Sequence, residues 1–170
     1  MGVSGCGKTS VGTALAARAG VAFIDGDDLH PPANIAKMAG GTPLDDDDRA
    51  PWLRAVGRAL AAAPAPAVIG CSALRRRYRD WIRAEVAEPV HFLHLDAPRE
   101  VLAGRVAHRR GHFMPSGLLD SQFATLEPLG ADELGRVIDI AQSQRAVVAA
   151  ASAYVAGTRS SGDSGDRRGR

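Results

Sequence analysis

Short runs of apolar residues alternate along the chain with longer stretches in which apolar positions recur every three or four residues. The short runs are typical of buried strands, and the longer pattern is typical of amphipathic helices. The predicted strands are residues 21–24, 67–69, 90–95 and 136–140. The predicted helices are residues 9–19, 46–62, 73–87, 98–109 and 142–155. Strands separated by helices predict an α/β fold with a mostly parallel sheet between two helical layers.

The length and the ends of this pattern suggest one domain. With 170 residues the chain can bury a single core. We expect this domain to span residues 1–156, with a small lid at about 108–127, where the pattern is irregular. Residues 157–170 contain only Gly, Thr, Arg, Ser and Asp, so they have no apolar surface to bury and are predicted to be disordered.

The residues before the first predicted helix carry the clearest chemical signal. Gly2 to Thr9 read G-V-S-G-C-G-K-T, which matches the phosphate-binding pattern G-x-x-x-x-G-K-[ST]. In that pattern the loop presents backbone N–H groups to an anion, Lys8 reaches the β- and γ-phosphates of ATP, and Thr9 binds Mg²⁺. The alternative without a ligand is a glycine-rich turn that caps a helix. The nucleotide-binding candidates are Gly2, Ser4, Gly5, Cys6, Gly7, Lys8, Thr9 and Ser10.

A phosphate loop of this kind normally follows a buried strand. Here only Met1 precedes it. We therefore expect the first strand of the fold to be truncated in this sequence.

Two carboxylates follow the strand at residues 21–24. Asp25 and Asp27 are two residues apart, so in a continuing strand they would face the same side. Phosphoryl transfer needs one acid near Mg²⁺ and another that orients and deprotonates the attacking hydroxyl. On spacing alone, a turn capped by an Asp side chain is equally compatible with the pair.

Composition excludes several other classes of function. The net charge of +2 is too small to indicate a nucleic-acid partner, and no apolar run approaches the roughly 20 residues of a membrane span. Two cysteines predict neither a disulfide framework nor a metal cluster. We therefore expect a cytoplasmic protein.

Several blocks of sequence resemble the gluconokinase family of P-loop small-molecule kinases. These blocks are residues 25–31, 34–38, 41–53, 71–80, 111–115 and 121–127. The resemblance implies a P-loop kinase fold and ATP-dependent phosphorylation of D-gluconate to 6-phospho-D-gluconate, with Mg²⁺. It also suggests a homodimer. The alternatives are a kinase of another small acceptor, such as shikimate or another sugar acid, and a nucleotide-sensing ATPase without an acceptor.

The same resemblance implies roles on the nucleotide side. By this resemblance, Asp27 is expected to be the catalytic base. Asp25 and Thr9 are expected to be the magnesium ligands. Arg109 and Lys8 are expected to act catalytically on the phosphates, and Arg105 is expected to stack on the adenine.

Acceptor-binding candidates are Asp27, His30, Arg49, Arg75 and His112. Arg49 could hold the carboxylate of the acceptor with two hydrogen bonds, or instead balance the acidic run at residues 45–48. His30 could donate to a hydroxyl or cap a helix.

Other side chains receive structural predictions. Arg76, Arg77 and Arg79 are predicted to lie on a solvated helix face, and Lys37 on the surface. Trp52 and Trp81 are predicted to lie in the core.

Overall fold

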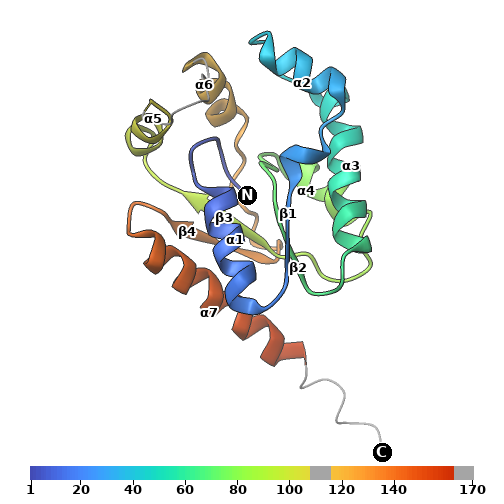
Figure 1. The fold of residues 1–170 in the computed structure, drawn as a ribbon, viewed down its shortest axis with the longest axis vertical. Helices are drawn as coiled ribbons and strands as arrows, with labels where there is room; N and C mark the ends of the chain where they lie inside the picture. Colours follow the sequence, from blue (N-terminus) through green and yellow to red (C-terminus); the bar gives the residue numbers. More distant parts are fainter. Residues whose placement is uncertain (108–115, 163–170) are drawn as a thin grey trace, which may run out of the picture.

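The computed structural model describes residues 1–107 and 116–162, which form helices around short strands (Figure 1). In chain order the elements are α1 (Lys8–Ala19), β1 (Ala22–Asp25), the 3₁₀ helix η1 (Gly26–Leu29), α2 (Pro32–Ala39), α3 (Asp46–Ala62), β2 (Ala67–Gly70), α4 (Arg76–Arg83), β3 (Phe92–Asp96), α5 (Arg99–Ala107), α6 (Ser116–Thr125), β4 (Gly135–Asp139) and α7 (Gln144–Gly162). Every predicted strand is confirmed, which supports the α/β assignment.

The helices agree less closely with the prediction. The helix expected at 46–62 has the observed bounds of α3, whereas α4 is shorter than its predicted range of 73–87. The short helix α2 was not predicted. The lid expected at about 108–127 contains α6, but residues 108–115 lie outside the described residues.

The predicted boundary of the disordered tail was wrong. Helix α7 continues to Gly162, so the first six residues of the expected tail are helical. The earlier turns of α7 pack into the core through Val147, Val148 and Ala151. Once these turns are formed, each further residue adds a helical hydrogen bond without a new nucleation cost, so apolar side chains are not needed.

The strands form two parallel pairs instead of the single sheet that was expected. β1 pairs with β2, Ala22 standing opposite Ala67, and β3 pairs with β4, Phe92 standing opposite Gly135. Met1 lies between the pairs. Its amine donates to Leu93 O at 2.5 Å and its carbonyl accepts from Leu95 N at 2.9 Å.

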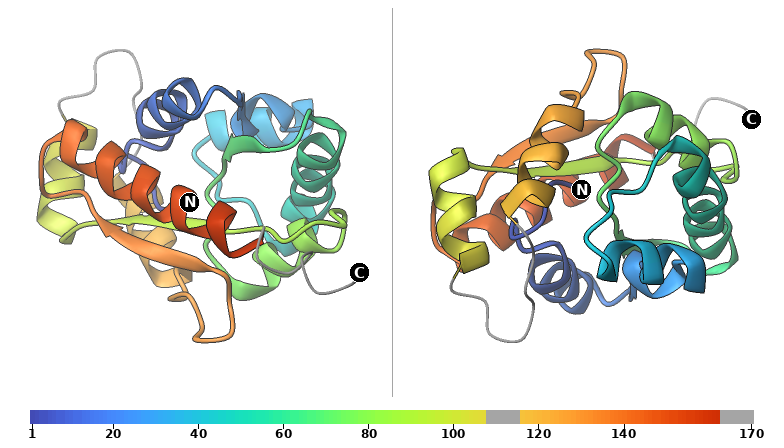
Figure 2. Two further views of the ribbon diagram at one scale, coloured as in Figure 1. Left: turned by 90° about the horizontal axis from the view of Figure 1, so that it is seen from below. Right: turned by 90° about the horizontal axis from the view of Figure 1, so that it is seen from above.

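The helices cover both pairs of strands. α1 packs against α7 and β2, α7 contacts β4, and α3 contacts β2 and α4. Figure 2 shows the same grouping from two further directions. The loop that begins at Met1 lies between α5 and α6 on one side and α2 and α3 on the other (Figure 1). The fold therefore places the phosphate loop between two pairs of helices, α5 with α6 and α2 with α3.

The buried apolar side chains form two clusters. One joins α1, α5 and α7 to the β3–β4 pair and includes Leu15, Leu95, Leu102, Ile138 and Val147. The other lies around α3 and α4 and includes Trp52, Leu53, Val56, Tyr78 and Ile82. Among the described residues, no helix has the length and apolarity of a membrane span.

Helix α3 begins with a complete capping box. The Asp45 carboxylate accepts from Asp48 N, and the Asp48 carboxylate accepts from Asp45 N, both at 2.9 Å. Lys37 forms an ion pair with each of these aspartates. The acidic run therefore caps the helix, and Lys37 is the cation that neutralises its first and last members.

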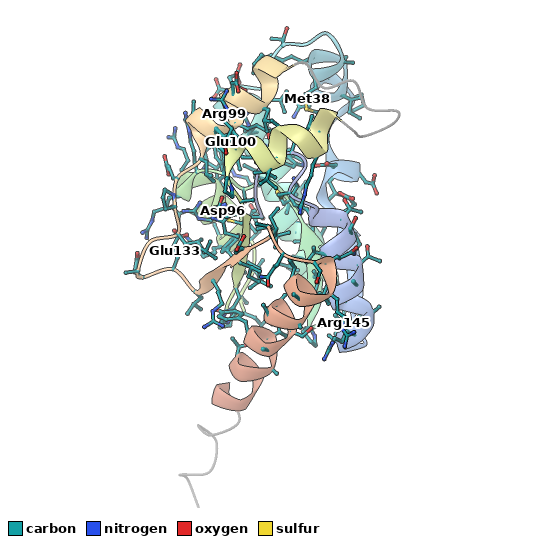
Figure 3. All side chains as sticks on the ribbon, turned by 90° about the vertical axis from the view of Figure 1, so that its left-hand side faces the viewer. Met38, Asp96, Arg99, Glu100, Glu133 and Arg145 are labelled. Carbon is teal, nitrogen blue, oxygen red and sulfur yellow. The ribbon has the colours of Figure 1, made fainter. Side chains whose placement is uncertain are left out.

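A buried ion pair corrects the prediction for Arg79. Its side chain is 0% exposed, and it donates from Nε and Nη2 to the Glu133 carboxylate at 2.7 Å. It also donates to the carbonyls of Ala73, Leu74, Glu127 and Pro128. Glu133, labelled in Figure 3, is 1% exposed and also accepts from Arg83. This ion pair links α4 to the loop before β4. The hydrogen bonds of both side chains offset the desolvation cost of burying their charges.

We predict that Glu133→Gln strongly destabilises the fold, because the Arg79 charge would stay buried without its counter-charge. Loss of one partner of such a pair costs about 3–5 kcal/mol of unfolding free energy. Urea unfolding followed by circular dichroism measures the change. The matched control is Asp132→Asn, which removes an exposed ion pair to Arg76 and should change little.

The same pair predicts a dependence on pH. Hydrogen bonds from Arg79 lower the pKa of Glu133 from 4.5 to about 2. Its stabilising contribution is therefore complete above pH 4.5 and is lost as the pH falls towards 2. An unfolding free energy that falls equally over this range in wild type and Glu133→Gln would contradict this assignment.

Candidate active site

The loop before α1 has the backbone of an anion-binding site. Gly7 has a φ of +87° and leads directly into the first turn of α1. Gly2 has a φ of +141°, and a Cβ there would lie 2.7 Å from Leu95 O. Successive N–H groups in such a turn, together with the positive end of a helix, favour phosphate. The sequence pattern therefore forms the structure that phosphate binding requires.

Two contacts hold the loop in place. Gly2 N donates to Ser72 O at 3.2 Å, and Ser4 N donates to the Gln122 side chain of α6 at 2.7 Å. Val3 and Cys6 are buried in the core. The Cys6 side chain is thus a small core residue, and only its backbone remains a nucleotide-binding candidate.

Lys8 lies across the loop that precedes it. Its Nζ donates to Gly2 O at 3.2 Å and to Val3 O at 3.3 Å. The ammonium group therefore lies on the carbonyls of the first residues of the loop.

The hydroxyl of Thr9 and the carboxylate of Asp25 meet at the end of β1. Thr9 Oγ1 donates to Asp25 Oδ2 at 2.9 Å. The other carboxylate oxygen, Oδ1, accepts from Asp27 N at 3.1 Å, so Asp25 also caps η1. Asp25 therefore caps a turn, as the turn alternative from the sequence required. It also contacts Thr9, the last residue of the phosphate-binding pattern.

Asp27 is not on the strand, which corrects the argument from strand periodicity. β1 ends at Asp25, and Asp27 lies in η1 with an exposed side chain. The chain turns at Gly26, which is buried and passes so close to β2 that a Cβ there would lie 2.5 Å from Gly70 O. The turn, and not a shared strand face, sets the direction of Asp27.

The buried thiol of Cys71, directly after β2, shows which charges gather at this edge. Burial raises the pKa of Cys71 to about 12. The negative charge of Asp27 raises this pKa further, while the Met1 amine and Lys8 lower it. Geometry places Lys8 and Asp27 in the same region: Gly70 of β2 lies against Gly26, the residue before Asp27, and a Cβ at Gly70 would lie 3.8 Å from Lys8 Cβ.

The start of α3, the residue before α4 and helix α6 enclose a polar hollow of about 460 Å³. Arg49 and Arg75 line it together with Asp46. The full lining is Pro43, Leu44, Asp45, Asp46, Asp47, Arg49, Arg75, Ser121 and Thr125. Two of the predicted acceptor-binding arginines thus face one space.

The arginines of the hollow are positioned by Asp46 and Tyr78. Asp46 accepts from Arg75 Nη1 at 3.2 Å, from Arg77 Nη1 at 2.6 Å and from the Tyr78 hydroxyl. The hydrogen bond from Tyr78 lowers the pKa of Asp46 most, and the positive charges of Arg75 and Arg77 lower it further. Arg49 stacks on the Tyr78 ring at 5.5 Å, and its Nη1 lies 3.4 Å from the Tyr78 hydroxyl. Among the described residues Arg49 forms no ion pair, so the prediction that it balances the acidic run is not supported.

His30 lies directly after η1 and packs on Trp52 of α3. Its ring stacks on Trp52 at 3.9 Å between centroids. Burial lowers its pKa, although Asp27 opposes this shift. Trp52 is 2% exposed and donates from Nε1 to Gly26 O at 2.8 Å, which confirms its place in the core. His30 therefore lies against Trp52, whose indole bonds to the turn that carries Asp27.

Of the site residues predicted in and after α5, the structure describes only Arg105. Arg105 Nη2 donates to Ile140 O at 2.7 Å, so its guanidinium lies beside the end of β4. Arg109 and His112 lie outside the described residues. Three residues that position the site, Asp46, Tyr78 and Gln122, had no predicted role, since their contacts are between segments far apart in sequence.

Comparisons with known proteins agree with this geometry. Residues 1–129 match the family model described as an AAA domain. The chain is 52% identical to a gluconokinase of Gluconobacter oxydans over 136 residues, which cover 78% of this chain and 76% of the relative. It is 45% identical to the thermoresistant gluconokinase of Escherichia coli, over 88% of this chain and 87% of the relative.

A solved structure extends the agreement to three dimensions. The crystal structure of a gluconokinase from Sinorhizobium meliloti superposes with a TM-score of 0.86 at 49% identity. The match covers 93% of this chain and 90% of the other.

We predict that Trp52→Phe lowers the unfolding free energy by about 1–3 kcal/mol, because the buried Gly26 carbonyl would lose its donor. Urea unfolding monitored by circular dichroism measures this. The matched control is Trp81→Phe, since that ring is only partly buried and stacks on Tyr78. Equal losses in the two variants would show that ring size, and not the hydrogen bond, is responsible.

Proposed function

Because the chain belongs to the gluconokinase family, we propose that it transfers the γ-phosphate of ATP to D-gluconate, giving ADP and 6-phospho-D-gluconate. The observation that carries this proposal is that one helix, α6, borders both halves of the site: Ser121 and Thr125 line the Arg49–Arg75 hollow, and Gln122 accepts a hydrogen bond from Ser4 N of the phosphate loop. A phosphate donor and an acid-bearing acceptor could thus be bound next to each other.

The nucleotide side follows from the loop. The N–H groups of Gly2, Ser4, Gly5, Cys6, Gly7, Lys8, Thr9 and Ser10 are proposed to surround the phosphates of ATP. Lys8 would exchange its two loop carbonyls for phosphate oxygens, where its charge offsets the charge of the leaving group. Arg105 is proposed to lie against the adenine, and Arg109 against the phosphates.

Magnesium fits the residues at the end of β1. Thr9 and Asp25 supply a hydroxyl and a carboxylate that already touch, and oxygen atoms are the ligands that Mg²⁺ prefers. Among the described residues no cluster of three or more acidic, His or Cys side chains could hold a metal by itself. This suits Mg²⁺, which keeps several waters and is usually shared with phosphates. When bound, the ion would neutralise charge on the phosphates.

The acceptor side needs a base and a cationic grip. Asp27 is exposed at the start of η1 and is proposed to take the proton of the attacking hydroxyl. Arg49 and Arg75 are proposed to hold the carboxylate of gluconate. Both guanidinium groups are fixed by Tyr78 and Asp46 before the substrate arrives, so less conformational freedom is lost on binding. His30 and His112 are proposed to contact hydroxyl groups.

The remaining expectations stay predictions. They are a homodimer, a cytoplasmic location, and the absence of nucleic-acid and membrane partners.

We predict that Asp27→Asn lowers kcat by about 10²- to 10⁴-fold, because the amide cannot accept the hydroxyl proton. ATP binding, measured by calorimetry, should be nearly unchanged. The neighbouring exposed carboxylate provides the control, and Asp28→Asn should keep its activity. Full gluconate-dependent ADP release by Asp27→Asn would rule out Asp27 as the base.

The acceptor is tested with a panel of sugar acids and shikimate in a coupled ADP assay. Gluconate should give the highest kcat/KM. If gluconate released no more ADP than a reaction without acceptor while another acid did, the proposed substrate would be wrong. ATP turnover that no acceptor stimulates would favour a nucleotide-sensing ATPase.

We predict that Arg49→Lys raises the KM for gluconate about tenfold or more, since an ammonium cannot form the paired hydrogen bonds of a guanidinium. The KM for ATP should not change. Arg58→Lys is the matched control on the same helix, because Arg58 is 59% exposed and pairs only with Glu85 in the described ion pairs. Parallel increases in both KM values would mean that Arg49 supports the site as a whole.

A further inference from the structure

The last turn of α6 and the residues just after it contact the phosphate loop on one side and the start of α4 on the other. Gln122 Oε1 accepts a hydrogen bond from Ser4 N at 2.7 Å. Glu127 Oε2 accepts from Arg76 N at 2.6 Å, and Glu127 N donates to Leu74 O at 2.8 Å. The partners of the two side-chain bonds are 118 and 51 residues apart along the chain. One short segment therefore joins two distant parts of the candidate active site.

Arg75, which lines the hollow, lies between the two residues that Glu127 contacts. Arg75 is also the N-cap of α4, and its own side chain forms no capping hydrogen bond. The first N–H groups of a helix have no partner inside the helix, and the Glu127 carboxylate supplies one to Arg76 N. A negative charge at this end is also favoured by the helix dipole. Glu127 therefore fixes the backbone that carries the Arg75 side chain.

The link between these two contacts is short and packed. Leu126 N donates to Gln122 O at 3.0 Å, so the helical turn that starts at Gln122 ends one residue before Glu127. A single turn advances only about 5.4 Å along the helix axis. Phe123 and Leu126 pack against the buried cluster that includes Leu102. Because packed interiors resist compression, a turn held in this way keeps the phosphate loop and the start of α4 at a fixed spacing.

We propose that residues 122–127 act as a rigid connector between the donor and acceptor subsites, with Gln122 and Glu127 as positioning residues. Gln122 acts through the phosphate loop, and Glu127 acts through Arg75. This inference rests on the proposed function, because it requires an acceptor held by Arg75. Transfer needs reacting atoms about 3–3.5 Å apart, and a misplacement of about 1 Å can cost roughly 100-fold in rate. A connector of fixed length maintains that spacing.

Glu127→Ala tests the acceptor end in the coupled ADP assay. It should raise the KM for gluconate about two- to tenfold, the range expected for one lost hydrogen bond, and leave the KM for ATP unchanged. Glu127→Gln keeps an oxygen for Arg76 N and should return the KM for gluconate to within about twofold of wild type. Both variants should fold, because the backbone bonds of Glu127 to Leu74 and Arg79 do not involve its side chain.

Asp132→Asn is the matched control for the acceptor end. Asp132 pairs with the guanidinium of the same residue, Arg76, and leaves the backbone N–H of Arg76 to Glu127. This variant should change neither KM value. An unchanged KM for gluconate in Glu127→Ala, or an equal rise in both KM values, would overturn the role of Glu127.

Gln122→Leu tests the donor end, and it stands alone if Glu127→Ala does not fold. The substituted side chain has a similar size but lacks the oxygen that accepts from Ser4 N. The KM for ATP should rise about two- to tenfold, while the KM for gluconate stays at its wild-type value. An unchanged KM for ATP would overturn the proposal at this end.

The double variant tests the connector itself. Each single variant releases one end of residues 122–127, so each should lower kcat. The second release should then add little, and the kcat of the double variant should lie within about twofold of the lower single value. Two independent contacts would instead multiply their losses, and multiplied losses would show that the segment is not a connector.

The same assay separates this inference from the proposed function. A wild-type chain that releases no more ADP with gluconate, or with any other acid of the panel, than without acceptor would refute both. If another acid is the acceptor, its KM replaces that of gluconate, and only the choice of substrate is lost. A wild-type enzyme that phosphorylates gluconate, but whose Glu127 and Gln122 variants keep both KM values, would refute the connector alone.

Discussion

The position of the phosphate loop depends on a few backbone hydrogen bonds at its first two residues. Met1 bonds to both Leu93 and Leu95, and Gly2 bonds to Ser72. These bonds attach the loop to β3 and to the segment just after β2, and these two strands do not pair with each other. Since the loop then passes directly into α1, its N–H groups and the helix dipole are aimed at the same edge. At Gly2 a side chain would collide with Leu95 O, so only glycine permits this approach.

Around this edge, charge is arranged by specific hydrogen bonds and ion pairs more than by sequence spacing. Asp46 binds two arginines and Tyr78, while Arg49 is left to the Tyr78 ring and the open hollow. The acidic run that might have neutralised Arg49 is instead used to cap α3 and to bind Lys37. As a result, a guanidinium without an ionic partner among the described residues faces the hollow, and this is the condition for binding an acidic ligand.

The sequence predicted the helices and strands better than the contacts between segments that are far apart along the chain. Strands were found because short apolar runs bounded by turns are local signals, and α3 was exact in its bounds because Asp45 and Asp48 form a capping box. Helix α2 was missed, although Pro32 occupies the first helical position, where proline is tolerated. The same limit applies to the site. The phosphate loop is contiguous and was readable, whereas the Asp46–Tyr78 and Ser4–Gln122 contacts join distant segments. Arg79 was misplaced for this reason as well, because its partner Glu133 lies 54 residues away.

An apolar slot of about 690 Å³ lies between β2, β3, α1 and α7, and it shares a wall with the candidate active site. Lys8, Gly70 and Cys71 line the slot, while Lys8 also holds the carbonyls of the loop and Cys71 lies among the charges of the site. A lysine at such a boundary keeps its aliphatic stem against apolar walls and its ammonium group at the polar edge. Any change in packing within the slot must therefore act on the stem of Lys8 and on the end of β2, next to the turn that carries Asp27. The geometry of the candidate active site thus depends on the packing behind the loop as well as on the residues that face the hollow.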